Sequence, residues 1–321
     1  MEAVTSNFHF HELQPAPDDF HTDVIAGLSG ETKRLSPKFF YDERGSQLFD
    51  AITRLPEYYP TRTEIGLLHQ YGKDMARMLG NDGLLFELGS GSGAKIRVLL
   101  EAMQPQTYAP IDISRETLRM SAGAIAQDHP KLEVHAICTD YSKPLDLSGF
   151  FDVQQRAVFF PGSSIGNFDP AQARDLLRRI AKLPGPDGRL LIGVDLKKAP
   201  ALLHAAYNDT QGVTAKFNQN LLTRINRELG ADFDVAAFRH EAFYNEKLGR
   251  VEMHLIATAP QCVRIDGCCF EFQVGESIHT ENSYKFSIEE FQTLAAQAGL
   301  ASLRVWQDDD ALFSVHCLRP V

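Results

Sequence analysis

The chain has 321 residues, of which 44% are hydrophobic and 23% charged, and its formal net charge is −10 at pH 7. That length allows about two domains of ordinary size, and the composition is that of a soluble globular protein. The acidic balance, without a cluster of lysine and arginine, argues against a nucleic-acid-binding surface, and no apolar run approaches the ~18 residues of a membrane span.

The five cysteines show no C-x-x-C spacing, and the histidines show no H-x-x-H spacing. We therefore expect reduced, structural cysteines in a reducing compartment, and no metal site. The N-terminus is acidic and polar, unlike a signal peptide. These features predict a cytoplasmic protein. The cysteines are Cys138, Cys262, Cys268, Cys269 and Cys317.

The first part of the chain, up to about residue 79, is rich in aromatic residues and proline. Residues 1–17 carry no clear pattern, and we expect them to be disordered or loosely packed. Periodicity predicts helices over 18–28 and 46–54 and a third one that ends near residue 79, with Thr61 and Glu64 as its capping box. Five aromatic residues in two tight groups are either core residues or a lid over a ligand: Phe39, Phe40, Tyr41, Tyr58 and Tyr59.

Residues 84–103, LLFELGSGSGAKIRVLLEAM, predict a strand, a glycine turn and an amphipathic helix. Such a unit begins a doubly wound sheet, and its glycines let a ligand approach the backbone closely. Gly89, Gly91 and Ala94 formally match the dinucleotide fingerprint G-x-G-x-x-A. Glu87 is instead typical of the S-adenosylmethionine (SAM) site of class I methyltransferases. The turn alone leaves a SAM site, a dinucleotide site and a purely structural turn open.

Two further predicted strands end in acidic residues. Asp112 closes the strand over 107–113, about twenty positions beyond the glycine turn, where a carboxylate suits ribose hydroxyls. The alternative for Asp112 is a helix cap. The strand over 132–138 is followed by Asp140 and Tyr141, a carboxylate and a ring that suit an adenine.

Residues 157–160 form the fourth predicted strand, and in doubly wound sheets the loop after this strand borders the catalytic crevice. Asn167 lies in that loop. Its amide could hold a substrate amine or carboxylate, or it is a turn residue after Gly166. A helix over 170–183 and a fifth strand over 189–196 follow.

The alternation of strand and helix stops at Lys197. A second domain or large insertion begins there, with helices over 199–207 and 213–229 and strands over 250–257, 261–265 and 269–281. The chain then returns to the first pattern, with a helix over 287–298 capped by Ser287 and Glu290 and a hairpin of 303–306 with 312–318. A terminal antiparallel hairpin on a parallel sheet fits a methyltransferase better than a dehydrogenase.

Within the insertion, Glu281 and Ser283 are two residues apart, so in a strand both point to the same face. A carboxylate and a hydroxyl together suit a ligand N–H group such as that of an imidazole. Met253 has a soft thioether that could cover a flat ring, although filling the core is its default role.

Five segments resemble the signature of one family, the SAM-dependent histidine Nα-methyltransferases of ergothioneine biosynthesis, which make trimethylhistidine (hercynine). The resemblance covers nearly the whole chain from about Leu35. The tyrosine-rich first segment and the last segment are more specific than the glycine turn. The segments are LSPKFFYDERGSQLFDAITRLPEYYPTRTE (35–64), ELGSGSGAK (87–95), PGSSIGNF (161–168), AAYNDTQGVTAKFNQNLL (205–222) and ENSYKF (281–286).

The resemblance implies a SAM site made of five residues. Gly89 and Lys95 would bind the methionine part of SAM, with Lys95 near its carboxylate. Asp112 would bind the ribose hydroxyls, and Asp140 with Tyr141 would hold the adenine.

The resemblance also implies the substrate residues. Tyr58, Asn167 and Tyr207 would contact histidine, with Asn167 and Tyr207 at its amino-acid head. Glu281 and Ser283 would read the imidazole beside Met253, and Tyr41 would lie near the α-amine. Tyr41 and Asn167 are the catalytic candidates.

By the same resemblance, the fold would be α/β: a Rossmann-like, doubly wound class I methyltransferase sheet with an antiparallel C-terminal hairpin, plus an α+β substrate-binding domain. The SAM-binding domain would comprise 63–196 and 286–321, and the substrate-binding domain 1–62 and 197–285. The expected reaction is trimethylation of the α-amine of L-histidine, with S-adenosylhomocysteine as the second product and no metal. We expect a monomer whose partner is this small molecule, not nucleic acid or a membrane.

Three other functions stay open. A methyltransferase of the same fold could act on another aromatic amine, although Glu281, Ser283 and Met253 argue against it. A nicotinamide-dependent oxidoreductase would use the formal dinucleotide fingerprint, against which Glu87 and the terminal hairpin argue. A non-catalytic nucleoside-binding module would make the substrate residues a coincidence.

Overall fold

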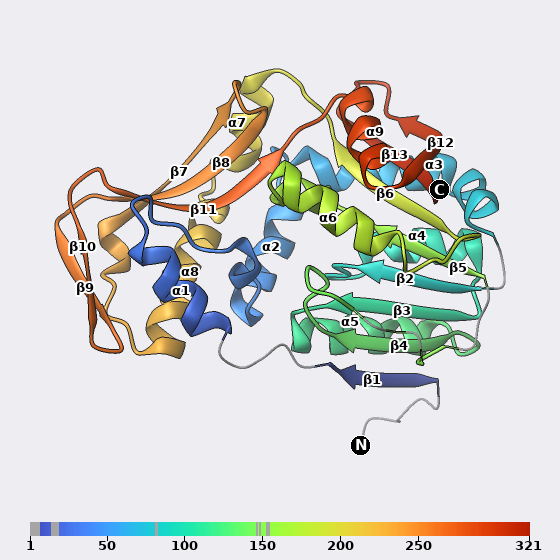
Figure 1. Cartoon of the computed structure of the whole chain (residues 1–321), viewed down its shortest axis with the longest axis horizontal. Coiled ribbons are helices and arrows are strands. Elements are labelled where there is room, and N and C mark those ends of the chain that lie inside the picture. The colour runs from blue at the N-terminus through green and yellow to red at the C-terminus, as the bar shows by residue number, and fades with distance from the viewer. Residues whose placement is uncertain (1–6, 14–18, 81–82, 146, 148, 152–154) are drawn as a thin grey trace. The chain divides into compact units, whose positions relative to one another are not determined.

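The computed structural model describes residues 7–13, 19–80, 83–145, 147, 149–151 and 155–321. Its contacts divide the chain into two compact units, coloured along the chain in Figure 1. The first unit comprises Met1–Gln14, Pro60–Lys197 and Tyr284–Val321, and the second unit comprises Pro15–Tyr59 and Lys198–Ser283. The main departure from the expected boundaries is at the N-terminus, which joins the first unit.

The first unit is built on one sheet, which has eight strands in the described part of the chain. Its order is β1-β4-β3-β2-β5-β6-β13-β12 (Figure 1). The strands from β1 to β6 run parallel, whereas β13 is antiparallel to β6 and to β12. This is the predicted parallel sheet with an antiparallel terminal hairpin. The strands are β1 (Phe8–Glu12), β2 (Leu84–Leu88), β3 (Thr107–Asp112), β4 (Glu133–Cys138), β5 (Arg156–Phe160), β6 (Arg189–Asp195), β12 (Leu300–Gln307) and β13 (Phe313–Pro320).

The sheet is covered on both faces because its central strands are apolar on both sides. On one face, helices α3 (Tyr59–Leu79), α4 (Ala94–Met103) and α5 (Arg115–Asp128) pack on strand residues such as Leu85. On the other face, α6 (Pro170–Ile180) and α9 (Ile288–Gln297) pack on residues such as Phe86. Neighbouring residues of β2 thus enter opposite cores, as the two-residue period of a strand requires. The predicted capping box of α9, Ser287 with Glu290, is present.

The strand β1 was not predicted, and the expectation of a loosely packed N-terminus is wrong for residues 8–12. Backbone pairing of β1 with β4 runs from Phe8 opposite Val134 to Glu12 opposite Cys138. The segment is short and alternates phenylalanine with histidine, which is a weak pattern on its own. Its order comes from the free edge that β4 offers. Residues 1–6 and 14–17, which the same expectation covered, lie outside the described residues.

The second unit combines helices with a three-stranded sheet of order β11-β8-β7 and a separate hairpin of β9 with β10, as counted over the described residues. Apolar residues of α8 recur at helical spacing, including Phe217, Leu221 and Ile225, and are buried. The helices are α1 (Asp19–Ser29), η1 (Pro37–Phe40), α2 (Glu43–Thr53), α7 (Pro200–Tyr207), α8 (Val213–Leu229) and η3 (Val235–Ala237), and the strands are β7 (Phe238–Asn245), β8 (Arg250–Ala257), β9 (Gln261–Ile265), β10 (Cys268–Phe272) and β11 (Ser277–Tyr284).

The predicted single strand over 269–281 is two strands. Chain direction changes between β10 and β11 in a turn where the N–H of Glu276 donates to the carbonyl of Gln273, 3.0 Å apart. Gly275 has φ 85°, a backbone conformation that glycine adopts without strain. The strand β7 lies between the predicted helix and the first predicted strand and was also missed.

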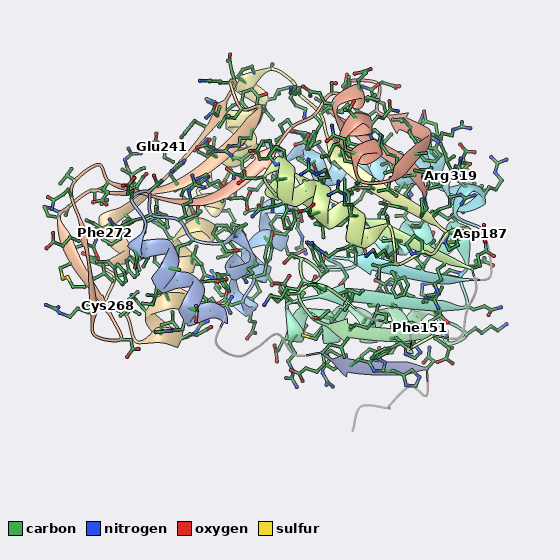
Figure 2. The ribbon with its side chains drawn as sticks, in the orientation of Figure 1. Phe151, Asp187, Glu241, Cys268, Phe272 and Arg319 are labelled. Atoms are coloured by element: carbon green, nitrogen blue, oxygen red, sulfur yellow. A yellow bond between two sulfur atoms is a disulfide. The ribbon has the colours of Figure 1, made fainter. Side chains whose placement is uncertain are left out.

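The expectation that all cysteines are reduced is contradicted by a disulfide between Cys262 and Cys269. Antiparallel pairing of β9 with β10 places Cys262 opposite Glu271 and Cys269 opposite Arg264, so the two cysteines are diagonal neighbours on one exposed face. Their sequence spacing does not reveal this, because it depends on the register of the hairpin. Cys268, labelled in Figure 2, is a free and exposed thiol.

Among the described residues, no helix combines the length and apolarity needed to cross a membrane.

Candidate active site

The glycine turn after β2 has the geometry that its sequence predicts. Gly89, Gly91 and Gly93 all have positive φ, at 72°, 50° and 74°. The Gly89 N–H donates to the carbonyl of Ile111, which ties the turn to the end of β3 at 2.8 Å. Helix α4 then starts with Gly93 as its cap residue and without a side-chain cap. A loop that brings backbone to a ligand, followed by uncapped N–H groups, is suited to a polar ligand.

Asp112 lies beside this turn, as predicted. One carboxylate oxygen accepts from the Gly91 N–H at 3.1 Å, and the other accepts from the Ser114 N–H at 2.9 Å. Burial raises the pKa of Asp112, although these N–H groups oppose that shift. A carboxylate has about four acceptor positions, so two backbone bonds leave it able to accept from ribose hydroxyls. The alternative role of Asp112, as the helix cap, is wrong, because the cap residue of α5 is Ser114.

Asp140 and Tyr141 follow β4 at the same edge of the sheet. The Asp140 carboxylate accepts from the backbone N–H of Ser142 at 2.9 Å and from its hydroxyl at 2.5 Å, which fixes its orientation. The Tyr141 ring packs edge-on against Phe160, with 5.6 Å between the ring centroids. A Cβ added to Gly89 would lie 3.6 Å from the Tyr141 hydroxyl, so the ring borders the glycine turn.

Glu87 is buried rather than presented to solvent. The Tyr108 hydroxyl donates to its carboxylate, and both side chains lie inside the first unit. Burial raises the pKa of Glu87 to about 8, while the bond from Tyr108 and the charge of Lys95 act in the opposite direction. Glu87 therefore lies in the interior of the first unit, two residues before the glycine turn, and does not face a ligand from solvent.

Lys95 lies at the start of α4 and pairs with Glu64 of α3, with 2.7 Å between Nζ and Oε2. The Glu64 side chain is 0% exposed, and its two oxygens also accept from the Gly162 N–H at 3.1 and 2.9 Å. The predicted capping box of Thr61 and Glu64 is therefore wrong. Helix α3 begins at Tyr59, and Glu64 joins the glycine turn to the loop after β5.

Asn167 ends the short helix η2 (Ser164–Asn167) in the loop after β5. This loop is fixed in two ways. The Asp195 N–H donates to Ser163 Oγ at 2.9 Å. The backbone of Tyr284 also packs so closely on Gly166 that an added Cβ would lie 2.7 Å from its carbonyl oxygen. The loop can hold the Asn167 amide in a defined place at the carboxyl end of β5.

Sequence reasoning also missed an ion pair between Lys285 and Asp195, with 2.7 Å between the charged atoms and 1% exposure of each side chain. Lys285 belongs to the quoted ENSYKF segment and Asp195 ends β6. The available signal was a lysine between two aromatic residues of that segment, but its partner could be found only from the fold.

In the second unit, Tyr207 at the end of α7 donates from its hydroxyl to Ser283 Oγ at 2.7 Å, and both residues are buried. Tyr58 packs edge-on to Tyr207, with 6.5 Å between ring centroids. The fold thus brings together three predicted substrate residues from distant parts of the sequence. Glu281 lies two residues before Ser283 on β11 and is half-buried. Met253 is 1% exposed on β8, opposite Ala242 of β7.

Tyr41 belongs to the same unit and packs edge-on to Phe49 and Phe217, with centroids 5.6 and 5.8 Å away. Its neighbour Asp42 caps α2 through the Gly45 N–H. Burial would raise the pKa of Asp42, but hydrogen bonds from Arg227, Gly45 and Asn220 lower it below its usual range. Asp42 thereby ties α2 to α8 on either side of the tyrosine.

The family model described as histidine-specific methyltransferase, SAM-dependent, matches residues 20–320 of this chain. A histidine N-alpha-methyltransferase of Mycolicibacterium smegmatis is 42% identical over 91% of this chain and 92% of its own length. A histidine N-alpha-methyltransferase of Mycobacterium tuberculosis is 41% identical with the same coverage. Ergothioneine biosynthesis protein 1 of Neurospora crassa is 32% identical over 85% of this chain, which corresponds to 32% of that longer protein.

The match spans both units, including the glycine turn of the first and the Tyr207–Ser283 pair of the second. The sheet order with its terminal antiparallel hairpin is that of a class I SAM-dependent methyltransferase. The chain belongs to the family of SAM-dependent, histidine-specific methyltransferases.

Proposed function

We propose that this protein transfers methyl groups from SAM to the α-amino nitrogen of L-histidine three times and so makes hercynine. The observation that carries the proposal is the 42% identity with a histidine N-alpha-methyltransferase across 91% of the chain. Apart from Asn167, the residues that the family resemblance assigns to the substrate belong to the second unit, where Tyr207 is hydrogen-bonded to Ser283.

The first unit fits SAM at the glycine turn. Gly89 and Gly93 have positive φ, which favours glycine, and glycine has no side chain that would obstruct a ligand. Backbone N–H groups hold the carboxylates of Asp112 and Asp140, and a carboxylate can accept several hydrogen bonds. SAM supplies an electrophilic methyl group when bound. We assign its methionine part to Gly89 and Lys95, its ribose to Asp112, and its adenine to Asp140 with Tyr141.

Lys95 has a second duty in this assignment. Its ammonium already pairs with buried Glu64, so it is held in place before any ligand arrives. An ammonium positioned by a buried carboxylate can meet a ligand carboxylate without first losing side-chain entropy. We infer that Glu64 positions Lys95 for the SAM carboxylate.

In the second unit, we assign the imidazole to Glu281 and Ser283. The Tyr207 hydroxyl donates to Ser283 Oγ and holds that side chain in place. A hydroxyl group is a donor as well as an acceptor, so Ser283 suits a ring nitrogen. Glu281 supplies the acceptor for the N–H of the other ring nitrogen. This pair selects a ring with both a donor and an acceptor, which phenyl and indole rings lack. Met253 keeps its proposed place beside the ring, and Tyr58 its contact with histidine.

The α-amine must lose a proton before each transfer, since free α-amino groups titrate near ~8. The family resemblance assigns Tyr41 to the surroundings of the amine, and we propose that Tyr41 and water relay the proton. For Asn167 and Tyr207 we keep the contact with the amino-acid head. Most of the rate then comes from alignment of the amine with the methyl group. After three transfers the nitrogen has no lone pair, so the reaction stops.

We place the reaction at the start of ergothioneine biosynthesis, because the similar fungal proteins carry that name. We also propose a cytoplasmic monomer that needs no metal for methyl transfer. The net charge of −10 supports a small-molecule substrate over nucleic acid.

The position of the methyl groups tests this function. Purified protein is incubated with SAM and L-histidine, and the product is analysed by mass spectrometry and by NMR. Three methyl groups on the α-nitrogen are expected, with mono- and dimethylated intermediates at early times. Methyl groups on a ring nitrogen, or a final product with one methyl group, would contradict the proposal.

A thermal-shift assay separates the SAM site from a dinucleotide site. S-adenosylhomocysteine should raise the melting temperature, because a hundredfold excess over Kd adds about 2.7 kcal/mol to the unfolding free energy. NAD(H) should leave the melting temperature unchanged. The reverse result would favour the oxidoreductase.

A further inference from the structure

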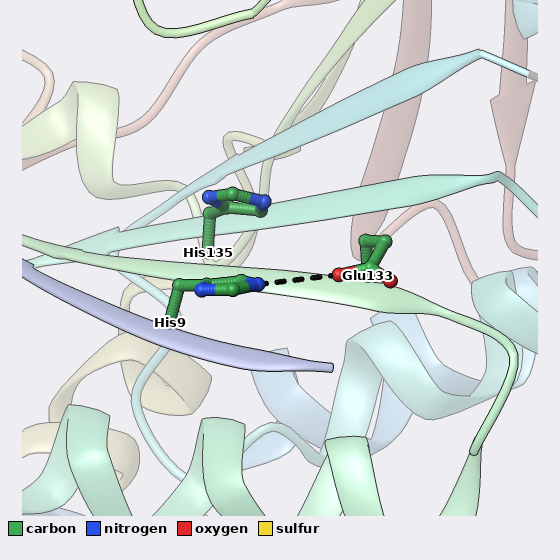
Figure 3. Close-up of side chains that lie close together, drawn as sticks. All are labelled: His9, Glu133 and His135. Carbon is green, nitrogen blue, oxygen red and sulfur yellow. Dashed lines mark hydrogen bonds and ion pairs between the residues drawn. The ribbon is translucent and has the colours of Figure 1, made fainter. Parts of the chain in front are cut away.

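The unpredicted strand β1 brings histidines to an edge of the first unit's sheet. In the parallel pairing of β1 with β4, His9 lies opposite His135 and His11 lies opposite Ile137. His9 and His11 are two residues apart, as are Glu133 and His135, so all four side chains lie on one face of the sheet. Figure 3 shows His9, Glu133 and His135 gathered over these two strands.

Three of these side chains lie within reach of one ion. His9 Nε2 is 3.3 Å from Glu133 Oε2, and the rings of His9 and His135 have centroids 4.5 Å apart. One ligand atom from each of His9, Glu133 and His135 lies within 4.8 Å of the others. Ligands at ~2.0–2.2 Å around a tetrahedral ion lie roughly 3.3–3.6 Å from one another. The His9 and His135 rings are stacked, with 26° between their planes, so the ion would have to turn the rings until their nitrogen lone pairs converge on it. The side chains of His9 and Glu133 are 44% and 53% exposed, which leaves room for those rotations.

His11 supports the group from the side. Its Nε2 lies 3.1 Å from His135 Nδ1, so one ring nitrogen of His135 is engaged by a neighbour. Metal-binding histidines commonly have their second nitrogen held in this way, which fixes the ring and its tautomer. His135 thus has one nitrogen held by His11 and a second, Nε2, to offer an ion. The rings of Phe150 and Phe151 pack edge-on against His11 and His135 and limit their rotation further.

We propose that His9, Glu133 and His135 bind one divalent transition-metal ion of the Zn²⁺ class, with His11 as a positioning residue. Two imidazoles and one carboxylate suit Zn²⁺, Ni²⁺ or Cu²⁺ and are a poor set for Mg²⁺ or Ca²⁺, which require mostly oxygen ligands. The ion would join β1 to β4, whose ligand residues His9 and Glu133 are 124 positions apart in the sequence. It would thereby hold the edge strand to the sheet. Local sequence patterns do not reveal this site, because its ligands come from two strands and only the register brings them together.

A second group in the described residues, Glu252, His254 and His279 of the second unit, is the natural competitor. It is less suited to a cation. The Arg250 guanidinium lies 2.9 Å from Glu252 Oε1, and His279 Nε2 already faces the carbonyl of Glu281 at 3.0 Å. A fixed positive charge beside the carboxylate opposes entry of another.

Zinc titration of the untagged full-length protein, by isothermal titration calorimetry, tests the site. Wild type should bind one equivalent of Zn²⁺ with no response to Mg²⁺. The double variant His9→Gln, Glu133→Gln changes two exposed side chains, and it should weaken Zn²⁺ binding by about tenfold or more. Its circular dichroism and melting temperature without metal should match wild type, which shows that the fold is intact.

Two control variants locate the ion. His69→Gln removes an exposed histidine of α3, and His254→Gln disrupts the competing group. Both should bind Zn²⁺ as wild type does. Absence of a Zn²⁺ equivalent in wild type, unchanged binding in the His9, Glu133 double variant, or loss of binding only in His254→Gln would each overturn the proposal.

Discussion

Glu64 shows how much one buried carboxylate can organise. It neutralises Lys95 at the start of α4 and accepts the Gly162 N–H after β5. A Cβ on Gly193 would lie 2.1 Å from Glu64 Oε1, so the neighbouring strand must carry glycine there. The residue was visible in the family motif, yet periodicity could assign it only a capping role. A buried partner on another element has no signature in local sequence.

Replacement of Glu64 by alanine should therefore be strongly destabilising. It leaves the Lys95 charge and the Gly162 N–H without their buried partner, which costs about 3–5 kcal/mol. Glu64→Gln keeps an acceptor and should cost less. Urea unfolding followed by the fluorescence of Trp306 measures the effect, since this is the only tryptophan of the chain and it lies in the first unit.

The control is Asp175→Ala, which breaks an exposed pair with Arg178 in α6. An exposed pair is worth about 0–1 kcal/mol, so this variant should unfold nearly as wild type does. If Glu64→Ala and Asp175→Ala lowered the unfolding free energy equally, the buried contacts of Glu64 would not stabilise the fold more than an exposed ion pair does.

Glu87 should make the first unit less stable as pH rises. Its pKa is raised from 4.5 to about 8 by burial, so between these values the folded state holds a proton that the unfolded state has lost. The destabilisation is absent below about pH 4.5, grows through the window by at most about 1.4 kcal/mol per pH unit, and is complete above about pH 8. Glu87→Gln should remove that slope.

The difference in unfolding free energy between Glu87→Gln and wild type, measured by Trp306 fluorescence at several values between pH 5 and 8, should grow with pH. Glu101→Gln, an exposed position of α4, supplies the same chemical change without burial. A pH-independent difference for Glu87→Gln, like that of the control, would show that Glu87 is ionised in the folded protein at neutral pH.

Glu281 carries the proposed substrate specificity. Glu281→Ala should raise the KM for histidine about 10- to 100-fold, the worth of one hydrogen bond to a charged group, and let other aromatic amino acids compete. Steady-state kinetics with histidine and with tryptophan measure both effects. Glu271→Ala, an exposed position of β10, is the matched control. Histidine kinetics unchanged by Glu281→Ala would remove Glu281 from the imidazole site.

At the scale of elements, a buried side chain just before β1 adds to the backbone pairing that holds this strand. The Asn7 amide donates to the carbonyls of Ala126, His129 and Leu132, between 2.8 and 3.2 Å away, at the junction of α5 and β4. These carbonyls include those that the end of a helix leaves without partners. Asn7 thus fastens the start of β1 to the sheet.

Asn7→Ala should lower the unfolding free energy of the first unit by about 1–3 kcal/mol, because buried carbonyls lose their donor. Asn7→Asp should be worse at neutral pH, since a carboxylate of the same size faces three acceptors and cannot donate. Trp306 fluorescence in urea measures both. If Asn7→Asp were as stable as wild type, the amide would not be the link that holds β1.

Elements with strong periodicity could be predicted, and elements set by pairing could not. The β2 run and the apolar stripe of α4 give their structure within one segment, and β8 and β9 have the predicted bounds. The strand β1 and the break between β10 and β11 depend on a free sheet edge and on a turn around Gly275. Such features require the register of strands that are distant in sequence.

At the scale of the whole molecule, periodicity indicated a methyltransferase sheet and an insertion, but it could not join the N-terminal block to that insertion. The fold supplies the link through the second unit, where Tyr58 packs beside Tyr207 and Asp42 binds Arg227 of α8. The resemblance to the family assigned the same blocks together because it rests on motifs from both. Residue chemistry alone left SAM and dinucleotide sites open at the glycine turn.

The most direct test is a competition for the methyl group. Purified protein is incubated with SAM and an equimolar mixture of histidine, tryptophan, tyrosine and phenylalanine, and the products are identified by mass spectrometry. We expect trimethylated histidine as the dominant product. Dominant methylation of another amino acid would contradict the histidine assignment and the role of Glu281 while it left the SAM-dependent fold in place.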